Sequence, residues 1–164
     1  MAVDMFIDID KIPGESKDAD AAFKGKIDVL AWSWGLSQSG SFQMGGGGGS
    51  GKVNVSDISF SKWVDISTPV LMLACANGDH IAKAVLTVRK AGKKPLNYIQ
   101  ITMEKIIVSS ISTGGSGGED RLTESVSLNF AKASFKYIQQ SDTGGEDTKK
   151  EFKWDIEGNT GDVS

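Results

Sequence analysis

The sequence predicts a mainly β fold, a compressed β-barrel or two-sheet sandwich that carries one short α-helix. Several separate segments alternate apolar with polar residues, which is the pattern of strands with one buried face. Glycine-rich turns separate many of these segments, as is typical of barrels and sandwiches. One stretch, about residues 68–77, has the composition and the end signals of a helix. Because the chain has 164 residues and no internal repeat, we expect one domain over residues 1–164.

Alternation indicates about seven or eight strands. Residues 3–10 alternate apolar with acidic side chains, and only Phe6 interrupts the pattern. In residues 126–137 the apolar positions shift by one residue after Phe130, which predicts a β-bulge or a bend within one strand. The other strands are expected within residues 27–36, 53–60, 82–89, 98–108 and 152–156.

The predicted helix has signals at both ends. The run Ser67-Thr68-Pro69 offers a capping hydroxyl and a proline in the first turn, where its missing N–H is not needed. The pair Asn77-Gly78 tolerates the left-handed conformation that ends many helices. Residues 70–76 are all apolar. We therefore expect the helix to plug one end or side of the barrel, or to be covered by a neighbouring subunit.

Glycine clusters mark the loops, at residues 45–51, 114–118 and 144–145. We expect a flexible loop at about residues 43–52 and a flexible tail after about residue 157. The charged run at 146–151 is expected to be an exposed loop.

Charge and composition exclude several classes of protein. The net charge is −3, the pI is near 5.2 and the basic residues are scattered, so we expect no nucleic acid partner. No stretch approaches the ~20 apolar residues of a membrane helix, so no membrane insertion is expected. The single cysteine, Cys75, fits a reducing cytoplasm. The acidic start does not resemble a secretory signal, so export would need a route without one.

No convincing catalytic, cofactor or metal site emerges. Gly46 to Lys52 has the spacing of a phosphate-binding loop, but Val53 replaces the magnesium-binding Ser or Thr and a strand follows instead of a helix. With one histidine, His80, and one cysteine, Cys75, there is no nitrogen–sulfur metal cluster and no plausible Ser–His–Asp arrangement. We expect no enzymatic activity and no cofactor.

Residues 30–36 have a more informative pattern. Alternation puts four bulky side chains on one face, which we expect to be core: Leu30, Trp32, Trp34 and Leu36. The other face is small and uncharged: Ala31, Ser33 and Gly35. Since a solvated outer face normally carries larger polar residues, we expect this face to meet another subunit or to line a confined cavity.

Several segments, in order along the chain, resemble the Hcp (haemolysin-coregulated protein) family. They are residues 1–7, 14–18, 32–35, 45–55, 67–78, 86–92 and, most specifically, 109–124. The resemblance extends to about residue 140, with departures at residues 18–26 and after Gln140.

The resemblance implies a structural subunit of the type VI secretion system, with the β-barrel architecture of phage tail tubes. Members form hexameric rings that stack into an inner tube, with a spike protein at the tip, a contractile sheath outside and small effector proteins in the lumen. The protein would be cytoplasmic before firing and then be secreted without a signal peptide.

The resemblance also suggests contact residues. The candidates for the lumen are Ala31, Ser33 and Gly35. The candidates for subunit contact or stacking lie in or beside two glycine-rich loops: Gly46, Gly47, Gly48, Gly49, Lys52, Ser116, Glu119, Asp120 and Arg121. From composition alone, the run 119–121 is equally an exposed charged turn.

Two other classes stay open. A β-sandwich module could bind a ligand such as a carbohydrate or lipid, and would need a concave pocket with convergent polar groups. An enzyme is the third class, for which the sequence supplies no catalytic residues.

Overall fold

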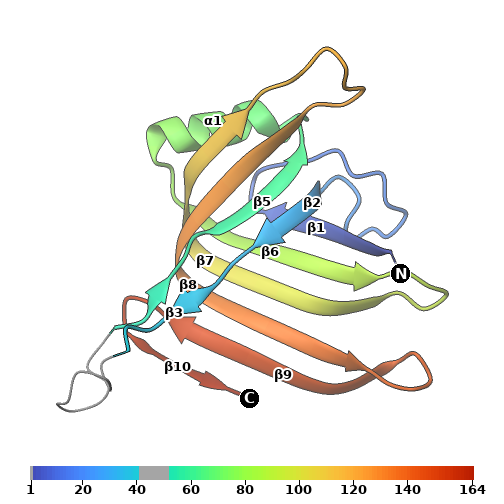
Figure 1. The fold of residues 1–164 in the computed structure, drawn as a ribbon, viewed down its shortest axis with the longest axis vertical. Helices are drawn as coiled ribbons and strands as arrows, with labels where there is room; N and C mark the ends of the chain where they lie inside the picture. Colours follow the sequence, from blue (N-terminus) through green and yellow to red (C-terminus); the bar gives the residue numbers. More distant parts are fainter. Residues whose placement is uncertain (1, 41–51) are drawn as a thin grey trace.

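The computed structural model describes residues 2–40 and 52–164 (Figure 1). These residues form one helix, α1 (Ser67–Asn77), and ten strands. The strands are β1 (Val3–Ile9), β2 (Ile27–Ser33), β3 (Leu36–Ser37), β4 (Asn54–Val55), β5 (Ile58–Trp63), β6 (Ile81–Lys90), β7 (Leu96–Thr113), β8 (Thr123–Gln140), β9 (Glu146–Asp155) and β10 (Thr160–Val163).

Six of the strands close into a barrel. The sheet has the order β10-β9-β8-β5-β2-β1-β6-β7, and β7 also pairs with β8, which completes the circle. All pairs are antiparallel, β9 and β10 extend the sheet beyond β8, and β3 pairs only with β4. The predicted fold class, mainly β with a barrel and one helix, is confirmed.

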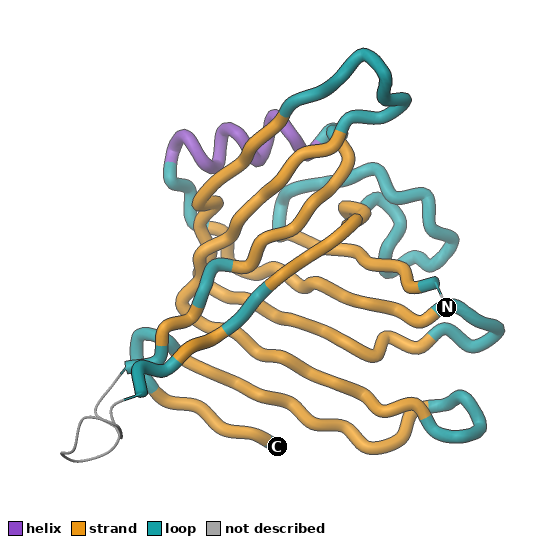
Figure 2. Tube along the Cα trace, in the orientation of Figure 1, coloured by secondary structure: helices purple, strands orange, loops and turns teal. Residues whose placement is uncertain are grey.

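The two longest strands bend where the apolar pattern changes phase. In β7 the residue Lys105 has φ +54°, in the left-handed region, and lies between Glu104 and Ile106. Buried side chains precede it at Ile101 and Met103 and follow it at Ile106 and Val108. The facing strand, β8, changes phase between Phe130 and Ala133 without a register shift against β7. The predicted bend is confirmed, and Figure 2 shows both strands turning from one part of the barrel into the other.

Helix α1 begins and ends close to its predicted bounds, but its first turn is capped differently. The N-cap is Ile66, whose side chain cannot cap; instead the Ser67 N–H donates to Asp65 Oδ1 at 2.9 Å. The predicted capping hydroxyl is therefore wrong, since a carboxylate two residues earlier takes that role. Gly78 ends the helix with φ +65°, as predicted. Among the residues described, no helix is both long and apolar enough to span a membrane.

A bulge in β2 changes the predicted core face. The pairing of β2 with β5 shifts by one residue between Val29 and Ala31, so Leu30 is the extra residue. Trp32 and Trp34 pack against the core as expected. Leu30 and Leu36 were also expected in the core, but they are 37% and 43% exposed.

The carboxyl-terminal region contains more strand than the sequence suggests. Residues 146–151, expected to be an exposed loop, form the first part of β9 and pair with β8, although their side chains are largely exposed. The tail expected after about residue 157 includes β10, which pairs with β9.

The loop between β1 and β2 is held by one arginine. The guanidinium of Arg89 lies 5.1 Å from the Phe6 ring centroid and 5.3 Å from that of Phe23. It donates to Asp18 Oδ2 at 2.6 Å and to Asp4 Oδ2 at 3.0 Å. This explains why Phe6 interrupts the alternation of β1: its side chain is buried on the second face of the strand, under the loop.

Candidate functional site

Four neighbouring strands present small side chains on one outward face of the barrel. Two cross-strand rows run over β2, β5, β8 and β7, in that order: Ser33–Ser59–Ser127–Ser110 and Ala31–Ser61–Ser125–Ser112. We call these eight residues the serine face. None of them is buried. A shallow hollow of about 200 Å³ lies over the part of this face formed by β2, β5 and β8.

The local sequence explains this arrangement. In each strand the two residues of the serine face are separated by one residue, so they share one face of the pleat. The residues between them point inward and pack on the core: Trp32, Phe60, Val126 and Ile111. The hydroxyls of Ser59 and Ser127 lie 3.0 Å apart and form a hydrogen bond across the strands. The inward side of these strands is therefore held by core packing, and the outward side is weakly polar.

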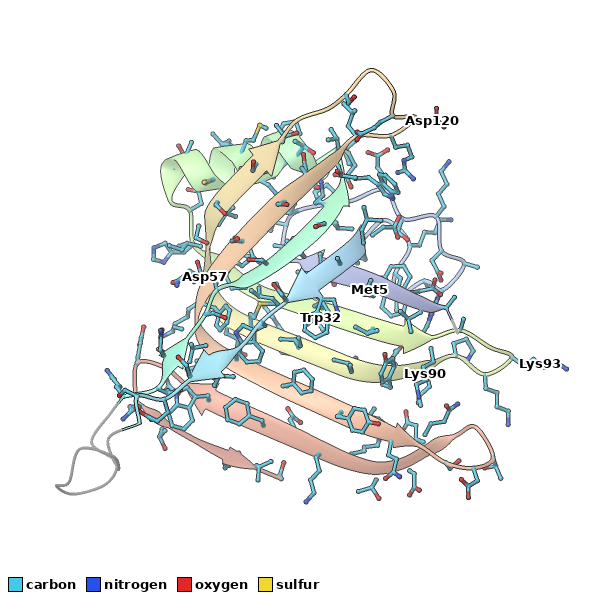
Figure 3. The ribbon with its side chains drawn as sticks, in the orientation of Figure 1. Met5, Trp32, Asp57, Lys90, Lys93 and Asp120 are labelled. Atoms are coloured by element: carbon cyan, nitrogen blue, oxygen red, sulfur yellow. The ribbon has the colours of Figure 1, made fainter. Side chains whose placement is uncertain are left out.

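Each end of the serine face carries larger groups. At one end, Arg121 Cζ lies 4.2 Å from the centroid of the Trp63 ring, a cation–π contact. At the other end, the Asp57 carboxylate accepts hydrogen bonds from Ser109 Oγ at 2.7 Å and from Asn129 Nδ2 at 2.8 Å. Figure 3 labels Asp57 at the start of β5.

Behind the serine face, a buried ionic cluster connects the strands to α1. Lys62 Nζ lies 2.6 Å from Glu124 Oε2 and 3.0 Å from Asp65 Oδ1, and neither Lys62 nor Glu124 has exposed side-chain surface. The Thr68 hydroxyl donates to Glu124 Oε2 at 2.8 Å. Because these groups lie on β5, β8 and the start of α1, the cluster determines where the helix begins relative to the serine face.

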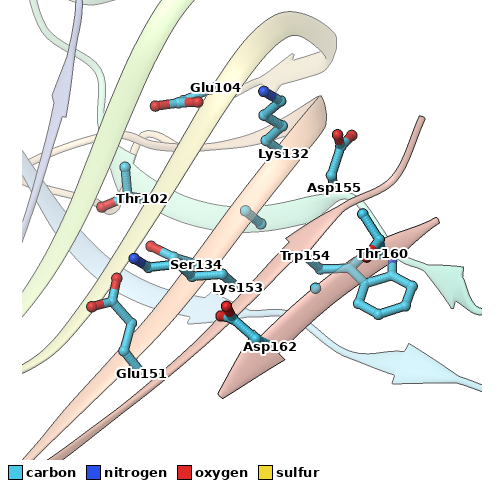
Figure 4. Close-up of a pocket in the computed structure, with 12 residues that line it drawn as sticks. Thr102, Glu104, Lys132, Ser134, Glu151, Lys153, Trp154, Asp155, Thr160 and Asp162 are labelled. Carbon is cyan, nitrogen blue, oxygen red and sulfur yellow. The ribbon is translucent and has the colours of Figure 1, made fainter. Parts of the chain in front are cut away.

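A larger hollow, of about 450 Å³, lies over β7, β8, β9 and β10 (Figure 4). Opposite charges face one another across its strands, since Lys132 pairs with Glu104 on one side and with Asp155 on the other. Such pairs stabilise a sheet. No cluster of three or more His, Cys, Asp or Glu side chains suited to a metal ion occurs in the described part of the chain. His80 is exposed and Cys75 is half-buried.

Comparison with known proteins identifies the family. The family model described as "Type VI secretion system effector, Hcp" matches residues 6–137. Protein hcp1 of Pseudomonas aeruginosa is 56% identical over 161 residues, covering 97% of this chain and 98% of that protein. The chain belongs to the Hcp family.

Solved structures agree with this assignment. The crystal structure of Hcp1 from Salmonella typhimurium is 32% identical, with a TM-score of 0.77 over 98% of this chain and 99% of that one. A structure described as a type six secretion system protein is 25% identical, with a TM-score of 0.87 over 98% and 100% of the two chains. The predicted resemblance is thus confirmed over nearly the full length, and this Hcp protein is a structural component of the type VI secretion tube.

The structure brings together some of the predicted contact residues of this Hcp chain. Ala31 and Ser33 lie in the serine face, whereas Gly35 follows β2 and its N–H donates to Ser56 Oγ at 3.0 Å. Ser116 accepts a backbone hydrogen bond from Glu119 in the exposed turn between β7 and β8, which also holds Asp120 and Arg121. Lys52 is exposed before β4. Gly46, Gly47, Gly48 and Gly49, with most of the predicted loop at 43–52, lie outside the described residues.

Sequence reasoning missed six of the eight serine-face residues. They are Ser59, Ser61, Ser110, Ser112, Ser125 and Ser127. A signal was available, because three segments repeat Ser-x-Ser within strand patterns. That these three repeats align with Ala31 and Ser33 depends on strand register, which the sequence pattern does not specify.

Proposed function

We propose that this Hcp protein assembles as a hexameric ring of the type VI inner tube, with the serine face lining the lumen. The observation that carries the proposal is the serine face: seven serines and one alanine in two rows on an outward surface. Strong protein contacts usually depend on aromatic or arginine anchors. A channel that passes varied cargo would avoid such anchors along its wall, and this face does.

The free strand edges support ring closure through the same sheet. In β2 only Ile27 and Asp28 pair with β1, so the rest of that edge has no strand of residues 2–40 or 52–164 beside it. In β7 the pairing with β6 stops at Ile106, so within the described part of the chain residues 107–113 pair only with β8. Free edges readily pair with another chain. If the β2 edge of each copy meets the β7 edge of the next, the serine face becomes continuous around the ring.

Stacking of rings and the contacts with other components complete the proposal. Two loops are proposed to contact a neighbouring subunit or ring. The first is the turn between β7 and β8, with Ser116, Glu119, Asp120 and Arg121. The second is the loop at about 43–52, with Lys52. The proposed partners are further copies of the chain, a spike protein at the tip, a contractile sheath and small effectors in the lumen. The protein would act without catalysis, be cytoplasmic before firing and be exported without a signal peptide. Family membership does not favour the alternative of a ligand-binding β-sandwich.

Two measurements test the proposal. Light scattering of the purified protein should give a mass near six times 17.4 kDa. A stable monomer at micromolar concentration would contradict the ring. In bacteria, deletion of the sheath should abolish export of this protein while its cytoplasmic level persists. Export that continues without the sheath would contradict the assigned route.

A further inference from the structure

Strand β10 contributes backbone to the fold and almost no buried side chain. It is the last strand in the order of the eight-stranded sheet, and Figure 1 shows it along the outer side of β9. All residues of Thr160–Val163 are exposed, and the Val163 side chain is 67% exposed. A strand that served the core would bury one of its faces. What β10 adds to the fold is therefore a backbone partner for β9.

This backbone partner covers the aromatic half of β9. β10 pairs with residues 152–155, which include Phe152 and Trp154, and these two rings stack with centroids 6.3 Å apart. Gly161 lies so close to the Trp154 ring that a Cβ at this position would be 2.6 Å from one ring carbon. Removing β10 would thus expose both a strand edge and the tryptophan ring beside it.

The other half of β9 is protected in a different way. Residues 146–150 have β8 on one side and no strand of the described chain on the other. Four of these five residues are charged: Glu146, Asp147, Lys149 and Lys150. Charged side chains on a free edge oppose pairing with another chain. β9 therefore carries charges where its edge is free and has β10 where its edge is aromatic.

Backbone geometry limits how the edge of β9 could pair with another copy. Glu151 and Ser164 exchange both of their backbone hydrogen bonds across β9 and β10. Such pairs alternate in an antiparallel ladder, so Lys153 and Asp155 also direct their backbone groups towards β10. Release of β10 would free these groups. An antiparallel contact between two β9 strands must then place the odd-numbered residues opposite one another.

One register of this kind is complementary. With Phe152 opposite Phe152 of a second copy, Glu151 lies opposite Lys153. Lys149 then lies opposite Asp155, and the two-fold symmetry repeats both charge pairs. Aromatic pairs and pairs of opposite charge stabilise antiparallel strands. The adjacent registers, centred on Glu151 or on Lys153, place like charges opposite each other, so the register centred on Phe152 is favoured over both.

We propose that β10 is a guard strand, which keeps β9 from pairing with β9 of a second copy. It provides Lys153 with an anion of the same chain, Asp162, in place of Glu151 from another copy. A two-fold contact through β9 differs from the head-to-tail contact that closes a ring, so it would compete with ordered assembly. The guarded edge lies outside the four strands of the serine face, so the inference does not depend on the proposed ring.

Two variants release β10 by different means. Gly161→Ala makes a Cβ collide with the Lys153 carbonyl oxygen. Asp162→Pro removes the backbone N–H that the alternation of the ladder directs at Lys153. In both, amide exchange of Ser164, whose N–H donates to the Glu151 carbonyl at 3.0 Å, should rise at least about tenfold. Because a two-fold contact joins copies in pairs, light scattering should give at least about twice the mass of the unaltered protein.

Two further variants with the same change of charge test the register. Added to Gly161→Ala, the substitution Glu151→Lys places a lysine opposite Lys153, so the mass should return to that of the unaltered protein. Glu146→Lys, added to Gly161→Ala, also replaces an acid by a lysine, but its opposite position in this register lies beyond the end of β9. Association should persist in this control.

The outcomes separate the guard strand from the proposed function. If β10 is released without a gain in mass, or if Glu151→Lys and Glu146→Lys associate equally, the guard role is overturned. Unchanged exchange of the Ser164 amide in both releasing variants also overturns it, because β10 would not depend on the contacts described. If the unaltered protein forms no ring, the proposed function fails, but a doubled mass on release of β10 still supports the guard strand.

Discussion

Lys62 and Glu124 face each other directly across β5 and β8, and their charged groups meet at 2.6 Å with no exposed surface on either side chain. Two buried charges lose their hydration, so such a pair is stable only when each ion has close partners. Lys62 has two carboxylates, the Trp63 carbonyl and the Thr68 hydroxyl within 3.4 Å. The arrangement is therefore specific, and removing one member should be far worse than removing the pair.

Lys62→Met should lower the free energy of unfolding by about 3–5 kcal/mol, because it leaves Glu124 buried without its cation. The double variant Lys62→Met with Glu124→Leu should recover most of that loss. Urea unfolding at one fixed protein concentration measures both. The control is Lys26→Met, which removes an exposed ion pair with Asp8 and should cost less than about 1 kcal/mol. Equal losses in Lys62→Met and Lys26→Met would contradict a structural role for the cluster.

Arg89 should make stability depend on pH through Asp18. The hydrogen bond from the Arg89 guanidinium holds the pKa of Asp18 below its usual range. A carboxyl whose folded pKa is lowered stabilises the protein above its unfolded pKa, and that contribution is lost as pH falls through the folded value. Stability should thus decline below about pH 4, and Asp18→Asn should flatten this decline.

Urea unfolding at several pH values between neutrality and about pH 2 checks the Asp18 prediction, since this range spans the usual carboxyl titration. The matched control is Asp10→Asn, which removes one carboxylate at the other end of β1, away from the Arg89 contacts. In Asp10→Asn the free energy of unfolding should decline at acid pH much as it does in the unaltered protein. If the free energy of unfolding of Asp18→Asn falls with pH as steeply as that of the unaltered protein, Asp18 is not the group responsible for the decline.

Gly161 should be required for β10 to pair with β9. A Cβ at this position would collide with the Lys153 carbonyl oxygen and with the Trp154 ring, both fixed by the sheet. Gly161→Ala should therefore detach residues 160–163 and raise their amide hydrogen exchange at least about tenfold, the effect of ~1.4 kcal/mol of lost local stability. Gly158→Ala is the control, because its Cβ would meet only side-chain atoms, of Asp155 and at ordinary contact distance of Thr160, and no backbone atom. Unchanged exchange in Gly161→Ala would contradict the predicted packing.

The fold class was predictable because alternation and turn composition are local properties of the chain. The bounds of α1 followed from Pro69 and Gly78, and the bend in β8 from the change of phase after Phe130. Local patterns failed where pairing decided the outcome. Residues 146–151 have a polar composition typical of loops, yet they form strand because β8 supplies a backbone partner along their length.

The candidate site was less predictable because it depends on register. The small face of β2 was visible in Ala31 and Ser33, but its continuation across β5, β8 and β7 depends on which residues stand opposite. One bulged residue, Leu30, was enough to move a large apolar side chain from the predicted core to the surface. The apolar residues on every side of α1 indicated that the helix would be covered, but not by what.

Ser33 should face the lumen of the assembled ring. Its side chain is exposed in the serine face, while the neighbouring Trp32 anchors the strand from behind. Ser33→Gln should leave the hexamer intact, because the Ser33 side chain makes no core contact and β2 takes part in the proposed subunit contact through its backbone, which the substitution keeps. Cargo retention should fall, since a closed ring repeats the added bulk in every subunit within one confined channel. Light scattering measures the ring, and co-purification of a small effector measures retention.

Ser33→Ala is the matched control for this prediction, because it removes the same hydroxyl without adding bulk and should retain cargo. A hexamer lost in Ser33→Gln but kept in Ser33→Ala would move this residue from the lumen to the subunit contact. If the glutamine variant changes neither assembly nor retention, the serine face points to the outside of the tube. The two readouts thus distinguish the three surfaces that a tube subunit has, because only a lumenal position couples added volume to cargo while sparing the ring.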